Sequence, residues 1–262
     1  MDVAHSAIPA ERWSVIEQEL AAHEYVRTVD LVERLDVSVE TVRRDLAVME
    51  SRGVLVRVRG GAVASGQKTR VESSYSERSQ SGQREKAAIG RAAAAMVPDD
   101  STVVIDVGTT ALHVVRSLST SFEGLLVTNS LPAATLASER LTCGVVVLGG
   151  RVRRGDLAVS GMRSHEFLQD FRPDVAFLGS GGISTSAGLT DFDYDEVHLR
   201  RVIIEVSAHA WVLADATKFG TVAPFRVGGF DDLAGVVTDQ QPSAELRESI
   251  VAAGGDVIVG AP

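Results

Sequence analysis

The stretch Val103–Val115, which reads VVIDVGTTALHVV, holds residues whose types and spacing suit the binding of an anion. β-forming residues lead into Asp106, and Gly108, Thr109 and Thr110 stand where a helix is predicted to begin. The first turn of a helix presents unpaired backbone N–H groups and a favourable dipole, so this turn can hold a phosphate. Asp106, at the end of the strand, is placed to accept a hydroxyl group of the same ligand.

Similar polar groups follow two other predicted strands. Thr128, Asn129 and Ser130 end one strand, and Gly149 and Gly150 end another. Because ligands of open parallel sheets bind beyond the carboxyl ends of the strands, we expect all these groups to line one crevice. The alternative interpretation is that each group is only a tight strand-to-helix turn, in which Gly, Ser, Thr and Asn are common.

Lys218, in the segment LADATKFG, adds a positive charge to this set. The chain has 23 arginines and 3 lysines, and Lys218 is the only lysine in residues 87–262. A compact ammonium group just after a strand can meet a phosphate as a point charge. The alternative interpretation is a surface lysine that occurs there by chance.

Cysteine and histidine do not indicate metal or thiol chemistry. Cys143 is the only cysteine, so the sequence holds no pair for a disulfide and no cysteine-rich metal site. The six histidines show no close pairing at the spacing of metal ligands on one helix. We therefore expect neither a metal nor a cofactor.

The elements that must position functional residues begin with three helices, predicted over residues 11–24, 28–36 and 38–53. Only a tight turn separates the second helix from the third, which is typical of a helix-turn-helix. Residues 54–63, VLVRVRGGAV, alternate apolar and basic side chains before a Gly-Gly turn and so predict a β-hairpin wing. We therefore expect a winged helix-turn-helix domain over residues 1–64.

The third helix exposes residues that suit contact with DNA. Its periodicity buries Val39 and leaves Arg43 and Arg44 on the outer face, where arginine can make paired hydrogen bonds to guanine in the major groove. The alternative is an ordinary surface helix whose arginines pair with Glu40 or Asp45. The candidate DNA-binding residues of the helix and the wing are Ser38, Thr41, Arg43, Arg44, Arg57 and Arg59.

The distribution of charge agrees with DNA binding, although the net charge of −9 does not. Residues 51–70 contain five basic residues and no acidic one, so this segment is the expected place for phosphate contacts. The expected partner is double-stranded operator DNA. One helix-turn-helix offers a small contact area, so we also expect a homo-oligomer, a dimer or a tetramer, that reads at least two half-sites.

The rest of the chain predicts a larger domain of the α/β class. Residues 65–84 are polar and suit a linker, and short Val-rich strands alternate with helices over residues 85–262. This alternation predicts a mostly parallel sheet with helices on both faces. No apolar run reaches the roughly 20 residues of a membrane helix, and the N-terminus lacks the pattern of a signal peptide, so we expect a cytoplasmic protein and no membrane partner.

The segment VSVETVRRDLAVMESRGVLVRVRGGAV closely resembles the DNA-binding signature of the DeoR family of bacterial transcriptional regulators, V-S-x-x-T-[IV]-R-R-D-L followed by a G-G-A wing. The family's wing usually reads H-G-G-A, whereas Arg59 stands in place of the histidine here. The resemblance continues in family order through DVGTT, VTNS, LGG, FLG, GLT and LADATKFG. It implies a C-terminal domain similar to pentose-phosphate isomerases and CoA-transferases that senses phosphorylated sugars, and it places Lys218, near Asp215, in the ligand site.

Two alternatives to a regulator remain at this point. A sugar-phosphate isomerase with an accessory DNA-binding domain needs a general base, and the segment LGSGGIS, where such isomerases carry carboxylates, holds none. Acidic residues of GLTDFDYDE could supply one: Asp191, Asp193, Asp195 and Glu196. An architectural DNA-binding protein would bind no ligand. We predict instead a repressor of sugar or carbohydrate metabolism genes, not an enzyme, that a phosphorylated sugar releases from its operator.

Overall fold

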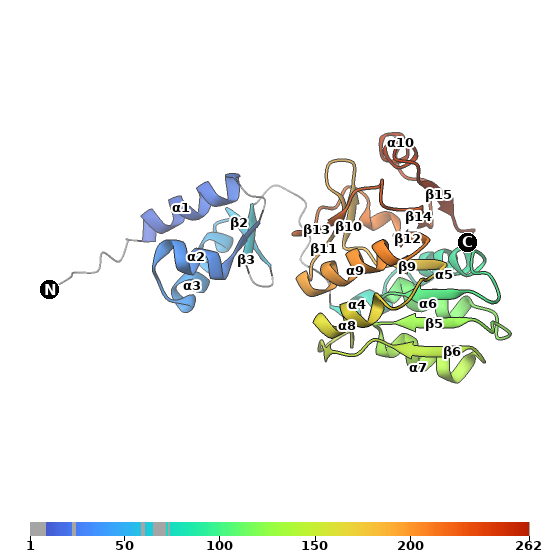
Figure 1. The fold of residues 1–262 in the computed structure, drawn as a ribbon. Helices are drawn as coiled ribbons and strands as arrows, with labels where there is room; N and C mark the ends of the chain where they lie inside the picture. The colour runs from blue at the N-terminus through green and yellow to red at the C-terminus, as the bar shows by residue number, and fades with distance from the viewer. Residues whose placement is uncertain (1–8, 23–24, 59–60, 65–71, 73, 262) are drawn as a thin grey trace. The chain divides into compact units, whose positions relative to one another are not determined.

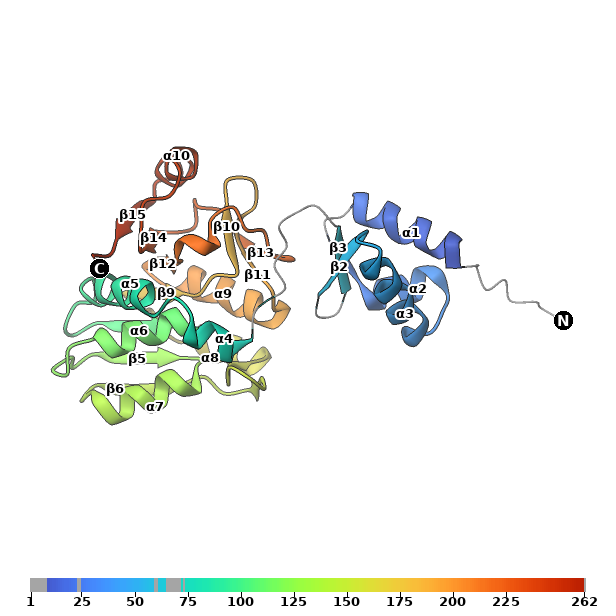
Figure 2. The same ribbon diagram turned by 180° about the vertical axis from the view of Figure 1, so that it is seen from behind.

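The computed structural model describes residues 9–22, 25–58, 61–64, 72 and 74–261 (Figures 1 and 2). The chain divides into two compact units, Met1–Glu72 with Val222–Pro224 and Ser73–Thr221 with Phe225–Pro262. We call them the helix-turn-helix unit and the sensor unit, and we describe each by itself.

The helix-turn-helix unit packs three helices against a small antiparallel sheet with the strand order β1-β3-β2. Its core is formed by apolar residues of all three helices, including Ile16, Leu31 and Leu46, and by Leu55 of the hairpin. The predicted winged helix-turn-helix is therefore present. Its elements are α1 (Pro9–Ala22), β1 (Tyr25–Arg27), α2 (Thr28–Leu35), α3 (Val39–Ser51), β2 (Leu55–Val58) and β3 (Gly61–Ala64).

One core prediction for α3 is wrong. Val39 is 41% exposed, because it is the first residue of the helix and lies beyond the core that Val42, Leu46 and Met49 enter. The buried face of α3 also contains a charged residue, Asp45, which the apolar pattern does not predict.

The sensor unit is built on a seven-stranded parallel sheet with the order β15-β14-β12-β9-β4-β5-β6. This confirms the predicted α/β class. The strands of this sheet are β4 (Thr102–Ile105), β5 (Leu125–Thr128), β6 (Gly144–Val147), β9 (Val175–Leu178), β12 (His209–Leu213), β14 (Gly235–Thr238) and β15 (Asp256–Val259). Shorter strands are β7 (Arg151–Val152), β8 (Val159–Ser160), β10 (Gly182–Ser184), β11 (Gly188–Asp191) and β13 (Phe225–Gly228).

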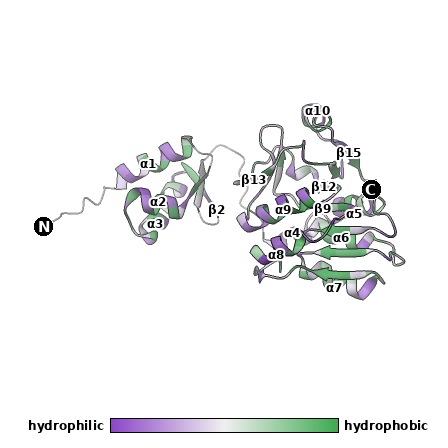
Figure 3. Cartoon of the chain, in the orientation of Figure 1, coloured by the Kyte–Doolittle hydropathy of each residue, from purple (hydrophilic) through white to green (hydrophobic). Residues whose placement is uncertain are grey.

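Helices cover both faces of this sheet, because successive strand residues alternate between two hydrophobic cores. Val103 and Ile105 belong to one core with apolar residues of α5, α6 and α7, whereas Val104 belongs to the other with residues of α8, α9 and α10. Figure 3 shows strands of this sheet in the green of hydrophobic residues. The helices are α4 (Tyr75–Gln80), α5 (Gln83–Ala94), α6 (Thr109–Ser117), α7 (Leu131–Arg140), α8 (Met162–Leu168), α9 (Tyr194–Val206), α10 (Ala244–Ala252) and the 3-10 turn η1 (Ala216–Lys218).

The strand order reverses between β4 and β9. The chain runs from β4 through β5 to β6 at one edge, then returns to β9 and continues through β12, β14 and β15 to the other edge. Val103 pairs with Val175 and Ile105 with Phe177 in the parallel register of β4 and β9. Such a reversal leaves a crevice beyond the carboxyl ends of the two strands, and this is the usual ligand position in sheets of this kind.

The helix α4 lies inside the stretch 65–84, for which the sequence predicts a linker. Its N-terminus carries a capping box, in which the Ser74 side chain accepts from the Glu77 backbone and the Glu77 side chain accepts from the Ser74 backbone. The two reciprocal bonds satisfy backbone N–H groups at the start of the helix and account for helix in a polar segment. Residues 65–71 and 73 of the same stretch lie outside the described residues.

Candidate functional site

The candidate DNA-binding helix is α3, and a serine cap fixes its start. Ser38 Oγ accepts from the backbone N–H of Thr41 at 3.1 Å and lies 2.9 Å from Thr41 Oγ1. A cap of this kind stabilises a helix by about 1 kcal/mol. Ser38 and Thr41 therefore order the N-terminal turn of the helix, which is the end that enters a major groove.

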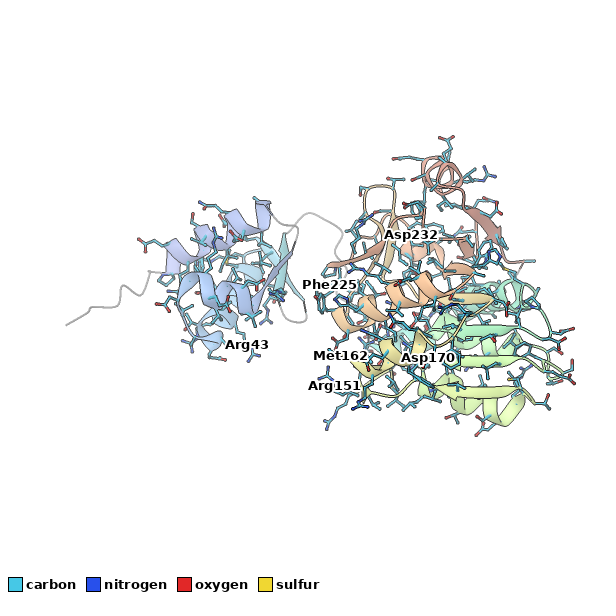
Figure 4. All side chains as sticks on the ribbon, in the orientation of Figure 1. Arg43, Arg151, Met162, Asp170, Phe225 and Asp232 are labelled. Carbon is cyan, nitrogen blue, oxygen red and sulfur yellow. The ribbon has the colours of Figure 1, made fainter. Side chains whose placement is uncertain are left out.

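Arg43 and Arg44 are exposed on α3, and Figure 4 shows Arg43 at the outer side of the helix. Neither side chain has a hydrogen bond or an ion pair within the part of the chain that the structure describes. The alternative that Asp45 neutralises them does not hold, because Asp45 is buried and accepts from Arg12 Nε at 2.6 Å and from Arg12 Nη2 at 2.9 Å. Trp13 Nε1 also donates to Asp45 at 3.0 Å. Residues of α1 therefore bind the buried face of α3, and Arg43 and Arg44 on the exposed face of α3 stay accessible.

The wing is only partly described. Arg57 donates from Nε to Glu50 at 2.7 Å, and the backbone N–H of Arg57 lowers the pKa of Glu50 below its usual value. The side chains of this pair are 46% and 36% exposed, so the pair is weak enough for Arg57 to exchange Glu50 for a phosphate. Arg59 lies outside the described residues.

The candidate anion site is the N-terminus of α6, directly after β4. Gly108 is the N-cap with φ of 141°, a conformation that side chains rarely adopt, and no atom lies within 4 Å of the place where a Cβ would stand. The helix begins at Thr109, so Thr109 and Thr110 contribute N–H groups that lack a partner within the helix. The turn therefore has the form that the sequence predicts.

Asp106 occupies a different role from the expected one. Its carboxylate accepts from Asn129 Nδ2 at 3.0 Å, from the Gly179 backbone at 3.0 Å and from Arg200 Nε at 2.6 Å. Protein donors thus occupy Asp106, and it joins β4 to β9 across the point where the strand order reverses. Because three donors already bind this carboxylate, an acceptor without a donor would serve a ligand hydroxyl better.

Asn129 supplies that acceptor. Its Nδ2 group faces Asp106, so its Oδ1 atom points to another side, where this buried oxygen has no hydrogen-bond donor among the described residues. The side chain is only 1% exposed. A buried acceptor without a donor costs free energy, which a hydroxyl of a bound ligand would recover.

Thr128 and Ser130 serve the local fold. Thr128 Oγ1 donates to the carbonyl of Ile105 at 2.6 Å and accepts from the Ser130 backbone at 3.0 Å. Ser130 Oγ caps α7 by accepting from the Ala133 backbone at 3.2 Å. The contacts of these two hydroxyl groups are those expected of a tight strand-to-helix turn.

Gly149 and Gly150, after β6, contact residues of α8 and β8. The carbonyl of Gly149 accepts from Ser164 Oγ, and a Cβ at Gly150 would stand 2.5 Å from the carbonyl oxygen of Ser160. Gly149 also lines a shallow groove of about 560 Å³ with residues of the α8 segment. The structure therefore ties Gly149 and Gly150 to α8 and β8 and not to the group around Asp106.

Lys218 ends η1, and Asp215 is the residue directly before this turn, after β12. Asp215 caps this turn by accepting from the backbone and hydroxyl groups of Thr217. Burial lowers the pKa of Lys86 of α5, the charge of Asp215 opposes this fall, and the charge of Lys218 adds to it. The sequence analysis missed Lys86, which is 4% exposed and donates to the carbonyl oxygens of Arg78 and Ser81.

Arg200 is a second residue that sequence reasoning missed. Its buried guanidinium pairs with Asp106 at 2.6 Å, with Asp191 at 2.6 Å and with Glu196 at 3.3 Å. Gly179 leaves room for it, since a Cβ there would stand 3.2 Å from Arg200 Nη2. The sequence did hold a signal, because Arg200 follows Glu196 by four residues on the face of α9 that also buries Leu199 and Ile203.

The acidic side chains of GLTDFDYDE, which the sequence offers as possible catalytic bases, form ion pairs or cap a helix. Asp191 and Glu196 pair with Arg200, while Asp193 caps α9 and pairs with Arg153 at 3.0 Å. Burial raises the pKa of Glu196 well above its usual value, and nearby Asp191 adds to the rise against the attraction of the two arginines. Asp195 pairs at the surface with Arg151 at 3.0 Å.

No group of three or more His, Cys, Asp or Glu side chains among the described residues is arranged to hold a metal ion. Within the same residues, no helix has the length and apolar character needed to cross a membrane.

Comparisons with known proteins cover both units. Residues 12–68 match the DeoR-like helix-turn-helix domain, and residues 81–240 match the DeoR C terminal sensor domain. The chain is 33% identical over 224 residues to the glycerol-3-phosphate regulon repressor of Escherichia coli (strain K12), which covers 86% of this chain and 88% of that protein. It is 31% identical to the HTH-type transcriptional repressor CsqR of the same organism, over 88% of each chain. Among solved structures, ribose 5-phosphate isomerase A of Methanocaldococcus jannaschii is similar with a TM-score of 0.40 at 17% identity, over 53% of this chain and 55% of that one.

Proposed function

The chain belongs to the DeoR family of DNA-binding transcriptional regulators, and from this premise we propose that it represses genes of sugar or carbohydrate metabolism until a phosphorylated effector binds its sensor unit. The family and the relatives are regulators and not enzymes, so the isomerase alternative is set aside. The relatives' names support repression, since one is the repressor of a glycerol-3-phosphate regulon.

A single observation carries the proposal for the effector. Gly108 is the N-cap of α6, after β4, and Asn129 follows the neighbouring strand β5, so both lie at the carboxyl ends of adjacent strands beside the reversal of strand order. The buried Oδ1 atom of Asn129 has no donor among the described residues. The N-terminus of α6 suits an anion, and this oxygen suits a hydroxyl group. A phosphorylated sugar or polyol carries both.

The proposed effector site therefore combines Gly108, Thr109, Thr110 and Asn129 with Lys218, while Asp106 and Arg200 hold the crevice in shape. We assign effector binding to residues 85–262 and DNA binding to residues 1–64. The proposed DNA contacts are base contacts by Arg43 and Arg44, ordered by Ser38 and Thr41, and phosphate contacts by Arg57 and Arg59.

The test of the proposed function is a thermal-shift screen of the full chain with glycerol 3-phosphate, fructose 1-phosphate, fructose 6-phosphate and the unphosphorylated compounds. Binding to the native state stabilises it by about 2.7 kcal/mol at roughly 100 times the dissociation constant, so a true effector should stand out. At least one phosphorylated compound should raise the midpoint, and its unphosphorylated partner should not. A shift that is equal for both members of each pair would contradict the anion site.

We also infer that the protein acts as a homo-oligomer, a dimer or a tetramer, in the cytoplasm, where operator DNA is accessible. A single helix-turn-helix has too small a contact area for useful specificity, and two copies would read two half-sites one or more helical turns apart. Light scattering at micromolar concentration should give at least twice the mass of 27.8 kDa. A monomer, with and without operator, would contradict this inference.

A further inference from the structure

The short helix α4 has an unusual place in the sensor unit. In chain order it is the first helix or strand of that unit, so residues 65–73 connect it directly to the hairpin that ends at Ala64. None of its six residues is buried. Tyr75, Arg78 and Ser79 are partly buried and the other three residues are exposed, so polar contacts contribute to the position of α4.

The first of these contacts is made by Lys86 of α5. Its Nζ group donates to the carbonyl oxygen of Arg78, in the last turn of α4, and to that of Ser81 at 2.7 Å. A cation at the carboxyl end of a helix satisfies carbonyl groups that lack a partner. Lys86 is buried and feels the charges of both Asp215 and Lys218, so a phosphate bound at Lys218 changes the electrostatic potential at the group that holds α4.

The second contact starts from the crevice. Arg200 pairs with Asp106 at 2.6 Å and with Glu196 at 3.3 Å. On its other oxygen, Glu196 pairs with Arg153 at 2.7 Å. Asp106, Glu196 and Arg200 are buried and Arg153 is partly buried, so water screens these groups little.

The same chain of charges continues from Arg153 to α4. Arg153 binds Asp156 with two nitrogen atoms, and Asp156 lies 3.8 Å from Arg78 Nη2. Paired acidic and basic side chains thus run without a break from Asp106, beside the anion site, to the side chain of Arg78. The contact of α4 through Lys86 and the contact through Asp156 both lead back to residues of the proposed effector site.

We propose that α4 transmits effector binding toward the DNA-binding unit, and that Arg78 is the residue that couples α4 to the effector crevice. This inference rests on the proposed function. A buried network that loses or gains one charge must re-pair its members, because an unpaired buried charge is costly. An anion bound beside Asp106 and Lys218 changes the balance of charge in this network, and with it the pairing of Asp156 with Arg78 in α4.

The test compares Arg78→Ala with wild type in the full chain. Three quantities are measured with the phosphorylated compound that gives the largest thermal shift among glycerol 3-phosphate, fructose 1-phosphate and fructose 6-phosphate: its dissociation constant, the operator dissociation constant without it, and the operator dissociation constant at saturation. Coupling in wild type is expected to weaken operator binding by roughly 5- to 150-fold. Arg78→Ala should keep the first two quantities within about threefold of wild type while its coupling ratio falls toward one.

Two variants separate coupling from stability. Arg84→Ala removes an exposed arginine from the adjacent helix α5 and should keep the wild-type ratio. Arg78→Lys retains the charge opposite Asp156 and should restore part of the ratio. Should Arg78→Ala fold poorly, Asp156→Asn removes the charge that faces Arg78 with little change of shape; it also removes the pair with Arg153, one step nearer the crevice in the same network, and should lower the coupling ratio as well.

Hydrogen exchange supplies a readout that a purely structural role would not move. Saturation with the compound should change the exchange rates of amides 75–81 in wild type and leave them unchanged in Arg78→Ala. If Arg78→Ala binds the compound and releases DNA with the wild-type ratio, the coupling role is overturned and the proposed function stands. If no phosphorylated compound binds wild type, the proposed function fails, and this inference fails with it.

Discussion

Arg43 and Arg44 differ from Arg57 in the partners that surround them, and this difference predicts different behaviour on DNA. The two helix arginines are accessible without an ion pair among the described residues, while Arg57 already pairs with Glu50. Losing Arg43 or Arg44 should cost about 1 to 3 kcal/mol on operator DNA and relax specificity at one base pair. Losing Arg57 should weaken all sequences alike and reduce the salt slope by about one.

Anisotropy titrations at several salt concentrations, on an operator selected from random DNA and on a scrambled copy, measure both effects. Glu40→Ala is the matched control on the same exposed face of α3. Equal losses on the two DNAs for Arg43→Ala and Arg44→Ala would show that these residues do not read bases.

Residues that act through local geometry could be predicted from the sequence, and residues that act through distant partners could not. The Gly108 turn and the exposure of Arg43 follow from strand and helix patterns within a few positions. Asp106 and Arg200 are 94 positions apart, and only the fold makes them a pair. Without that pair, the carboxylate of Asp106 looked free of protein donors, whereas the buried acceptor without a donor among the described residues is Asn129 Oδ1.

At the scale of elements, α1 and α3 are joined by one buried ion pair. Arg12 and Asp45 form a two-bond contact, to which Trp13 adds a third donor, and the bond to Asp45 raises the pKa of Arg12. Removing one partner leaves the other charge buried, so Asp45→Ala should destabilise the helix-turn-helix unit by about 3 to 5 kcal/mol.

Urea unfolding followed by Trp13 fluorescence measures this change selectively in a Trp211→Phe background, because the chain has 2 tryptophans. Glu40→Ala, at an exposed site on the same helix, should change the free energy of unfolding by less than about 0.5 kcal/mol. If Asp45→Ala lowered the free energy of unfolding by as little as Glu40→Ala does, the Arg12–Asp45 pair would contribute little to the packing of α1 on α3.

The helix α6 carries a pH-dependent contribution to stability. Burial lowers the pKa of His113 to about 4, with Arg116 and Lys86 adding to the fall. Between pH 6.5, the ordinary value, and pH 4 the unfolded chain binds a proton that the folded protein does not. The free energy of unfolding is therefore not reduced by this group above pH 6.5. Below pH 6.5 it falls as the pH is lowered toward 4, by at most about 3 kcal/mol.

Unfolding free energies of wild type and His113→Gln, measured from pH 7 to pH 4, isolate this contribution, since other groups titrate alike in both proteins. Wild type should lose more stability than the variant over this range. Parallel curves would mean that His113 is as easily protonated in the folded protein as in the unfolded chain.

The parallel sheet could be predicted at this scale because Val-rich runs of four or five residues alternate with helices. The helix α4 could not be recognised from composition, since a capping box and not apolar periodicity sets it. The strands β7 and β8 have two residues each and are too short for any pattern.

At the scale of the whole molecule, a DNA-binding unit and a sensor unit are present in one chain, and we propose that an effector bound to the second controls operator binding by the first. Lys218 offers the simplest test of this control. It belongs to the sensor unit, whereas the residues of the proposed base contacts belong to the helix-turn-helix unit, so its loss should affect effector binding and not DNA binding. Allosteric coupling vanishes when the effector no longer binds, while operator affinity of the free protein is unaffected. Thr109→Val should weaken the response less than Lys218→Ala does, since it removes a hydroxyl group and not a charge.

The most direct test is operator binding measured against rising concentrations of the phosphorylated compound identified by the screen, for wild type, Lys218→Ala and the control Arg247→Ala on the exposed face of α10. The account predicts that all three proteins bind the operator equally without the compound. Wild type and Arg247→Ala should then release DNA at the same concentration, and Lys218→Ala should stay bound at concentrations at least tenfold higher, which corresponds to about 1.4 kcal/mol of lost binding. Release of Lys218→Ala at the wild-type concentration would contradict the account, because the anion would then be held elsewhere and the turn at Gly108 would serve only the fold.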